Sequence, residues 1–182
     1  KFLNLIFLFF IFNNCFFSFH IDTLKIFSFS MNKEIKNIVI TPDFHKNKKD
    51  LPSVYLLHGA YGNHTDWTSK TVGLGKYSDI NDIVLVFPDG GKNSWYFDSP
   101  IDKTYKYETY ITLELIPLVD SIYNTSKEKS FRAISGLSMG GHGAFYIAFK
   151  NSNLFTAAGS MSGGLDIRPF FKNWDIRDRL GP

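Results

Sequence analysis

Short apolar runs separated by polar segments recur along the chain after residue 20. Runs of this length, rich in Val, Ile and Phe, are typical of β-strands. They lie at residues 21–27, 35–40, 54–57, 83–87, 131–135 and 155–161. The uninterrupted runs at 54–57 and 83–87 indicate strands buried on both faces of a sheet. The first two runs flank a polar turn at Met31–Glu34 and predict an antiparallel pair at one edge.

A second pattern, with apolar residues three or four positions apart, predicts helices. It is clearest between Glu108 and Tyr123, where the stripe consists of Ile111, Leu115, Leu118, Val119 and Ile122. Pro117 lies inside this stretch and predicts a kink or a local break, because proline lacks the N–H that a helix interior needs. Further helices are expected at 139–150 and 174–180. The polar, lysine-rich stretch 43–52 is expected to be a loop.

Strands that alternate with helices at this spacing predict βαβ units. The expected fold class is therefore α/β, with a mostly parallel sheet, helices on both faces and an antiparallel edge. In open sheets of this kind, functional sites lie at the carboxyl ends of the strands. The loops expected at that edge are residues 58–67, 89–98 and 136–141.

Composition places the chain among ordinary globular proteins of about one domain. Of its 182 residues, 44% are hydrophobic and 20% are charged, and the formal net charge is +3. This balance excludes the disordered class, which needs low hydrophobicity and high net charge. The basic residues form no long run, so the sequence offers no patch on which nucleic acid would bind.

Residues 1–19 have the order of a secretory signal peptide. Lys1 is followed by the apolar run Leu5–Phe12 and then by small and polar residues. A membrane anchor and a buried strand are the alternatives, but asparagines interrupt a stretch that would need about 20 apolar residues to span a bilayer. We expect a secreted or periplasmic protein, cleavage near Ser18–His20, no stable membrane insertion afterwards, and a folded domain at 20–182.

Cys15 is the only cysteine of the chain. Its place at the end of the apolar run leaves lipidation open, but the residues before it are not the small ones that such a site usually has. A lipid anchor is therefore the less favoured alternative. Because no cysteine follows, the folded domain can form no disulfide and no thiolate metal site.

The most specific feature is the pentapeptide Gly136-Leu137-Ser138-Met139-Gly140, which stands between an expected strand and an expected helix. This strand–turn–helix context is typical of a nucleophile elbow, in which the serine occupies a sharp, strained turn above the sheet. The helix that follows directs its free N–H groups at the serine. The alternative is a glycine-rich turn that has no chemical role.

A second loop suits the same chemistry. The strand at 54–57 runs directly into His58-Gly59-Ala60-Tyr61-Gly62. In hydrolases with such an elbow, two backbone N–H groups form the oxyanion hole, one from the residue after the nucleophile and one from this loop. The candidates are Met139 and Ala60, with Tyr61 as the alternative to Ala60. The alternative is that His58-Gly59 forms an ordinary turn at the end of the strand.

Together, four segments resemble a known family: LLHGAYGNHTDW, FPDGGKNSWYFDSP, YETYITLELIPLVD and RAISGLSMGGHGAFYIAFKNSNLFTAAGSMSGGLD. The chain is similar, from about Ile21 onward, to the esterase D / feruloyl esterase-like branch of the α/β-hydrolases. The resemblance implies carboxylic-ester hydrolysis through an acyl-enzyme, with Ser138 as nucleophile and the Ala60 and Met139 amides as oxyanion donors.

The resemblance also implies residues that line the substrate cleft, namely Tyr61, Trp67, Trp95 and Tyr96. For the two tryptophans and Tyr96, ordinary core packing is an equal alternative. The implied substrate is a small-molecule or carbohydrate ester, and neither a metal nor an organic cofactor is expected. The acyl group, the alcohol and the oligomeric state stay open.

The triad of such enzymes runs in the order serine, acid, histidine along the chain. The histidines are His20, His45, His58, His64 and His142, and none follows the helix after Ser138. His142 is a poor base because it lies on that same helix. Asp166, Asp175 and Asp178 suit surface positions better than an acid's role.

We therefore expect the acid and base beyond Pro182, which makes this chain a fragment that lacks the last strands and is inactive alone. Two other functions stay open. One is an acyltransferase of the same family, in which a sugar hydroxyl accepts the acyl group. The other is a non-catalytic carbohydrate-binding module, which would have no use for a strained, exposed serine.

Overall fold

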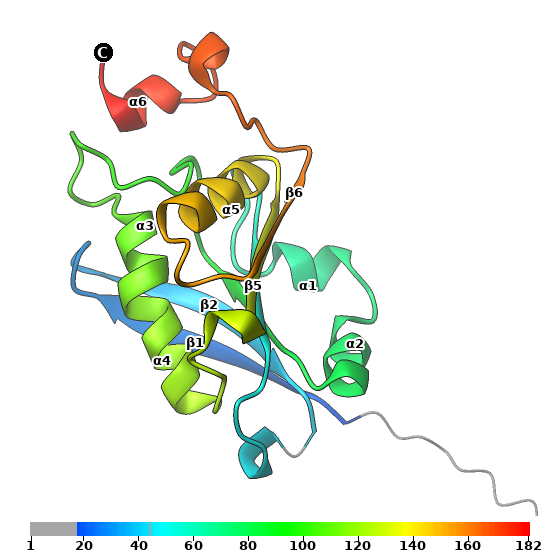
Figure 1. Cartoon of the computed structure of the whole chain (residues 1–182). Helices are drawn as coiled ribbons and strands as arrows, with labels where there is room; N and C mark the ends of the chain where they lie inside the picture. Colours follow the sequence, from blue (N-terminus) through cyan, green and yellow to red (C-terminus); the bar gives the residue numbers. More distant parts are fainter. Residues whose placement is uncertain (1–17, 44) are drawn as a thin grey trace, which may run out of the picture.

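The computed structural model describes residues 18–43 and 45–182, and its central element is a mixed β-sheet with helices on both faces (Figure 1). The expected signal peptide lies almost wholly outside the described residues. The strands are β1 (His20–Ser28), β2 (Lys33–Thr41), β3 (Ser53–Leu57), β4 (Val84–Pro88), β5 (Arg132–Leu137) and β6 (Ala157–Met161). The helices are α1 (Asp66–Lys70), α2 (Leu74–Asn81), α3 (Tyr107–Thr109), α4 (Ile116–Ile122), α5 (Met139–Lys150) and α6 (Ile176–Leu180).

Sheet order is β1-β2-β4-β3-β5-β6. Strands β4, β3, β5 and β6 are parallel, whereas β2 runs antiparallel to both β1 and β4. This confirms the expected α/β class with a mostly parallel sheet and an antiparallel edge. Because β4, β3, β5 and β6 point the same way, the loops that follow them gather at one edge of the sheet.

The hairpin at the antiparallel edge differs from its prediction in the turn. The turn occupies residues 29–32, and Lys33 and Glu34 already belong to β2. Met31 is only 3% exposed, so it packs into the core, although its polar neighbours suggested a solvated turn. Asn32 adopts the left-handed conformation (φ 52°) that such turns often require.

Two apolar clusters lie on the two faces of the sheet. The larger one packs alternate strand residues such as Tyr55, Val86 and Ile134 against α4 and α5. The smaller one contains Ile38, Ile40, Leu85 and Phe87, with Trp67 of α1 and Leu74 of α2 packed on them. Figure 1 shows α3 and α4 on one side of the sheet and α1 and α2 on the other. The sequence did not reveal α1 and α2, because each is too short to display a repeating apolar stripe.

The helical stretch predicted between residues 108 and 123 is present but not uniform. A π-helical segment, Tyr110–Leu115, connects α3 to α4. Pro117 stands in the first turn of α4, where a helix tolerates proline because an N–H is least needed there. The predicted local break therefore takes the form of wider π-helical turns just before the proline. No helix in the described part of the chain is long and apolar enough to cross a membrane.

A buried arginine fixes the start of β5. Arg132 is 2% exposed, and its Nη2 donates to Asp120 Oδ2 at 2.7 Å and to the Ser126 carbonyl at 2.7 Å. Its Nη1 donates to the Leu154 carbonyl at 3.2 Å. The other oxygen of Asp120 accepts a hydrogen bond from Thr125 at 2.5 Å. The ion pair thus joins the end of α4, the loop after it and the segment before β6 to the strand that carries the elbow.

We predict that Asp120→Ala lowers the free energy of unfolding by about 3–5 kcal/mol, because it leaves the buried guanidinium without a counter-charge. The matched control is Lys25→Ala, which breaks an exposed pair with Glu34 whose charged atoms lie 3.9 Å apart. The control is expected to cost less than about 1 kcal/mol. Urea unfolding followed by circular dichroism measures both, and equal losses in the two variants would contradict the prediction.

Candidate active site

Ser138 stands at the sharp turn between β5 and α5. Its backbone has φ 54° and ψ −115°, a conformation that is costly for any residue other than glycine, and its side chain is exposed. The amide of Ser138 donates to the Met161 carbonyl at the end of β6 (2.8 Å), and its carbonyl accepts from His142 in α5 (3.0 Å). The predicted strand–turn–helix context of Ser138 is therefore present, and neighbouring backbone holds the strained turn.

The turn is possible because backbone passes directly against backbone around it. A Cβ on Gly140 would lie 2.3 Å from the Leu57 carbonyl oxygen, and a Cβ on Gly136 would lie 2.4 Å from the Gly140 carbonyl carbon. Neither position therefore has room for a side chain. The first turn of α5 rests on the end of β3, which sets the distance between Ser138 and the loop after β3.

The loop after β3 lies beside the serine. A Cβ built on Gly59 would be 3.5 Å from the Ser138 Cβ. The Tyr61 amide donates to the Lys92 carbonyl at 2.6 Å and is therefore occupied. The Ala60 amide has no hydrogen-bond partner among the described residues, and Ala60 is exposed. Of the two alternatives that the sequence left open, the geometry favours Ala60 as the free donor.

Met139 is the first residue of α5, and its side chain is fully buried. The N–H groups of a first helical turn have no partner within the helix. The Met139 amide is thus the second free donor next to Ser138, at the positive end of the helix dipole. In this arrangement the exposed serine hydroxyl can attack a carbonyl carbon, and the two free amides can stabilise the oxyanion that forms.

His58 holds two of the loops at this edge together. Its Nε2 accepts a hydrogen bond from the Gly90 amide (2.8 Å), so Nδ1 carries the proton and donates to the Gly59 carbonyl (2.7 Å). Burial lowers the pKa of His58, which keeps the imidazole neutral. His58 therefore links the loop after β3 to the loop after β4 and has no free nitrogen for catalysis.

The aromatic residues predicted to line the cleft occupy different environments. Tyr96 is fully buried, donates to the His58 carbonyl (3.1 Å) and packs against Gly143, which favours the packing alternative. Trp95 is 3% exposed and lies edge-on to His142. Trp67 is half-buried, donates to the Leu57 carbonyl (3.2 Å), and lines a cavity of about 120 Å³ together with Gly59 and Leu137. Tyr61 is 67% exposed.

His142 packs among aromatic rings. It is 6% exposed, and its Nδ1 donates to the Gly164 carbonyl at 2.8 Å. The rings of Trp95, Phe97 and Tyr146 surround it. Burial lowers the pKa of His142, and no described residue hydrogen-bonds to its Nε2. This environment agrees with a packing role and gives the imidazole no contact with the Ser138 hydroxyl.

The candidate acids lie on the segment after β6. Asp166 is exposed and forms a two-pronged pair with Arg168, whose hydrogen bond lowers the pKa of the carboxyl to about 2. Asp175 accepts hydrogen bonds from Tyr61 (2.5 Å) and Asn93 (3.1 Å), and the bond from Tyr61 lowers its pKa. The sequence gave no indication of this Asp175 contact, because its partners are far away along the chain. Asp178 is exposed on α6.

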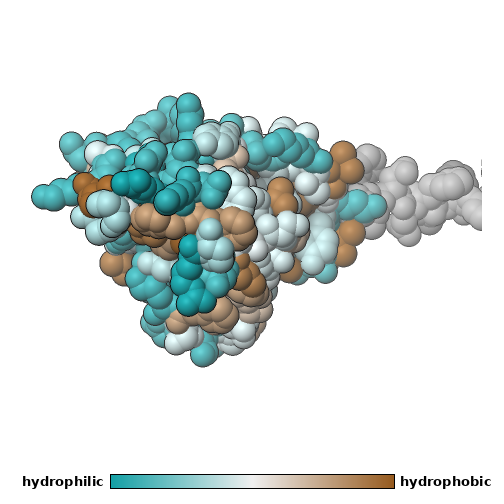
Figure 2. All heavy atoms as spheres, turned by 90° about the horizontal axis from the view of Figure 1, so that it is seen from above, coloured by the Kyte–Doolittle hydropathy of each residue, from teal (hydrophilic) through white to brown (hydrophobic). Residues whose placement is uncertain are grey.

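Backbone strain is concentrated at this edge of the sheet. The loops there carry left-handed φ values at Tyr61, Trp95, Tyr96, Ser138, Ser162, Trp174 and Asp175. Strained residues persist only where their surroundings determine them, and they cluster at functional sites. Large hydrophobic side chains that remain exposed in these loops or at the strand ends before them include Tyr61, Leu137, Met161, Leu165, Phe170 and Trp174. Figure 2 looks onto this end of the molecule and shows brown apolar patches between polar ones.

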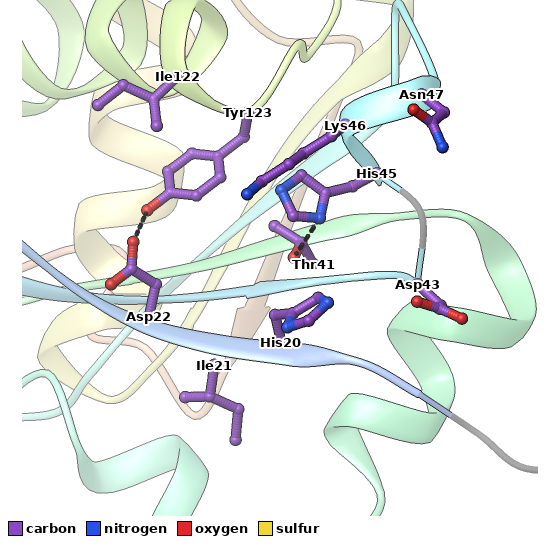
Figure 3. Close-up of a pocket in the computed structure, with 10 residues that line it drawn as sticks. All are labelled: His20, Ile21, Asp22, Thr41, Asp43, His45, Lys46, Asn47, Ile122 and Tyr123. Carbon is purple, nitrogen blue, oxygen red and sulfur yellow. Dashed lines mark hydrogen bonds between the residues drawn. The ribbon is translucent and has the colours of Figure 1, made fainter.

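A larger cavity, of about 720 Å³, lies at the opposite edge of the sheet (Figure 3). The start of β1 and the end of β2 line it, at the amino-terminal side of β4. Two hydrogen bonds cross it, from Tyr123 to Asp22 (2.6 Å) and between Thr41 and His45 (3.0 Å). Among residues 18–43 and 45–182, no group of three or more His, Cys, Asp or Glu side chains could hold a metal ion.

The sheet order and the elbow at Ser138 define an α/β-hydrolase fold. The chain belongs to the Esterase family, whose model matches residues 28–178. This confirms the resemblance that the four sequence segments indicated. The residues matched run from the end of β1 into α6, so they include the elbow and both of the loops that flank it.

The relatives are esterases and an acyltransferase. Esterase Rv1288 of Mycobacterium tuberculosis is 30% identical over 74% of this chain and 30% of its own length. Diacylglycerol acyltransferase/mycolyltransferase Ag85A of Mycobacterium leprae is 34% identical over 80% of this chain and 44% of its own. The structure of a ferulic acid esterase superposes with a TM-score of 0.71 at 29% identity, covering 82% of this chain and 62% of that one. The chain thus spans less than half the length of these two curated relatives.

We predict that Gly140→Ala lowers the free energy of unfolding by more than about 2 kcal/mol, because the new methyl group would meet the backbone of β3. Gly164→Ala is the matched control, since a Cβ there would have no neighbour closer than 3.7 Å. Chemical unfolding measures both variants. A Gly140→Ala protein as stable as Gly164→Ala would show that α5 does not rest on β3 in this way.

Proposed function

We propose that this chain carries the nucleophile and the oxyanion hole of a secreted serine carboxylic-ester hydrolase. The observation that carries the proposal is the exposed, strained Ser138 beside two unpartnered amides, those of Ala60 and Met139. Membership of the Esterase family supports the reaction class. Secretion rests on residues 1–19 of the sequence alone.

The proposed reaction has two steps. Ser138 Oγ forms a bond to the ester carbonyl carbon, its proton passes to a general base, and the two amides donate to the resulting oxyanion. The carbonyl then re-forms, the alcohol leaves with a proton, and water hydrolyses the acyl-enzyme by the same route in reverse. Each oxyanion donor is worth about 100- to 1000-fold in rate.

The general base is still required. No described histidine hydrogen-bonds to the Ser138 side chain, since His58 and His142 have other partners. The assays below therefore use the complete gene product. Expressed alone, residues 1–182 are expected to hydrolyse p-nitrophenyl acetate poorly. An oxyanion hole without a general base accelerates such a reaction only about 10³- to 10⁴-fold over water.

For the substrate, we propose small acyl esters or sugar and feruloyl esters. The similarity to a ferulic acid esterase supports an ester of an aromatic acid. The cavity beside Gly59, Trp67 and Leu137 holds only about 120 Å³, and it supports a small acyl group. Tyr61 stays a candidate for substrate contact because most of its side chain is exposed.

Acyl transfer is the second candidate, and the 34% identity to a diacylglycerol acyltransferase/mycolyltransferase favours it. Both reactions share the acyl-enzyme and differ only in whether water or a hydroxyl group accepts the acyl group. A carbohydrate-binding module is a weaker candidate, because binding alone would not require the strain at Ser138.

We predict that a fluorophosphonate probe labels the complete gene product and that Ser138→Ala abolishes the labelling, because Ser138 combines exposure with two free amides beside it. Ser69→Ala is the matched control, since Ser69 is exposed on α1. The Ser69→Ala protein should be labelled like the parent protein. In-gel fluorescence measures the signal. Undiminished labelling of Ser138→Ala would refute the assignment of the nucleophile.

Product analysis separates hydrolysis from transfer. With p-nitrophenyl acetate and no acceptor, a hydrolase releases acetate and p-nitrophenol in equal amounts. Adding a sugar acceptor at high concentration should leave these yields unchanged. If acetylated sugar instead replaces most of the free acetate, the acyltransferase is correct and the hydrolase is not. Mass spectrometry of the products gives the ratio.

A further inference from the structure

A single carboxylate joins three separate segments above the sheet. Asp175 immediately precedes α6, and its Oδ2 accepts hydrogen bonds from the Tyr61 hydroxyl (2.5 Å) and the Asn93 side-chain amide (3.1 Å). Tyr61 belongs to the loop after β3, and Asn93 belongs to the loop after β4. The contact therefore connects both loops of the site to the segment that follows β6.

Tyr61 needs such support. It has φ 61°, a costly conformation for an aromatic residue, and 67% of it is exposed, so packing contributes little to holding it. Two hydrogen bonds hold it instead. Its amide donates to the Lys92 carbonyl (2.6 Å), and its hydroxyl donates to Asp175. Tyr61 directly follows Ala60, whose amide is the proposed oxyanion donor, so a relaxed Tyr61 would reorient that amide.

We propose that Asp175 is a positioning residue for the oxyanion hole: by holding the Tyr61 hydroxyl, it fixes the turn that directs the Ala60 amide toward the reacting carbonyl. This inference rests on the proposed function. Asp175 itself touches no reacting atom. Loss of the Asp175 carboxylate is expected to slow the reaction of Ser138, because the Ala60 amide must lie where the oxyanion develops.

The segment that carries Asp175 is anchored independently of its carboxylate. The Trp95 indole N–H donates to the Trp174 carbonyl (2.9 Å), and Ser99 donates to the Arg179 carbonyl (2.6 Å). The Arg179 guanidinium also lies against Asp102 (3.4 Å). Removing the Asp175 carboxylate therefore releases Tyr61 and Asn93 while the segment stays docked, which makes a substitution informative.

The test measures how fast Ser138 of the complete gene product reacts with a p-nitrophenyl phosphonate. The Ser138 Oγ–phosphorus bond forms, the serine proton passes to the general base, the bond to the aryl oxygen breaks, and p-nitrophenolate leaves. Asp175→Ala is expected to slow this reaction about 10- to 100-fold, in line with the cost of a displaced donor. Asp175→Asn keeps an oxygen that accepts from Tyr61, so it should stay within about 3-fold of the parent rate. Asp178→Ala, an exposed acid on α6, should leave the rate unchanged.

A double-substitution cycle separates positioning from general stability. Tyr61→Phe removes only the hydroxyl and should slow the reaction as much as Asp175→Ala, and the combined variant should be no slower than either one. The inference is overturned if the rate losses of the two single variants multiply in the combined variant. It is also overturned if either single variant reacts at the parent rate. Thermal unfolding shows whether each variant folds. If Asp175→Ala does not, Tyr61→Phe alone decides.

The failure of the proposed function has a different signature. A folded parent protein that does not react at Ser138 at all would overturn the function and this inference together. If the parent protein reacts at Ser138 and both Asp175→Ala and Tyr61→Phe react at the parent rate, only the inference about Asp175 is overturned. Loss of rate in Asp175→Ala without recovery in Asp175→Asn would also count against it.

Discussion

Direct contact between the backbone of α5 and the end of β3 is the constraint on which the site depends. A Cβ at Gly140 would lie 2.3 Å from the Leu57 carbonyl oxygen, so the helix and the strand can meet only because the residue is glycine. That contact turns the chain sharply at Ser138 and brings the serine beside the loop of Gly59 and Ala60. The strain at Ser138 is thus a consequence of packing, and the packing core of α4, α5 and the sheet sustains it.

Polar contacts between loops hold the remaining parts of the site. His58 connects the loop after β3 to the loop after β4 through a donor and an acceptor nitrogen, and burial keeps it uncharged. The buried ion pair of Arg132 and Asp120 lies at the other end of β5, away from the serine. Fixed backbone amides would therefore stabilise a developing oxyanion.

The sequence predicts the features that local patterns determine. Continuous apolar runs located the strands, and the glycines around Ser138 located the elbow, because both follow from short-range sterics. Contacts between distant segments escape such patterns. Nothing near Tyr61 in the sequence indicates that it meets Asp175, and no pattern distinguishes the fully buried Tyr96 from an aromatic residue of the cleft. The short helices α1 and α2 were missed for a related reason, since their position depends on packing against the sheet.

The acyl-enzyme at Ser138 is the central proposal. The most direct measurement is mass spectrometry of the complete gene product after rapid acid quenching of its reaction with p-nitrophenyl acetate. We expect one acetyl group on the peptide that contains Ser138, and we expect it to appear before steady turnover. Turnover with no acetylated serine, or acetylation at another residue that keeps pace with turnover, would contradict it.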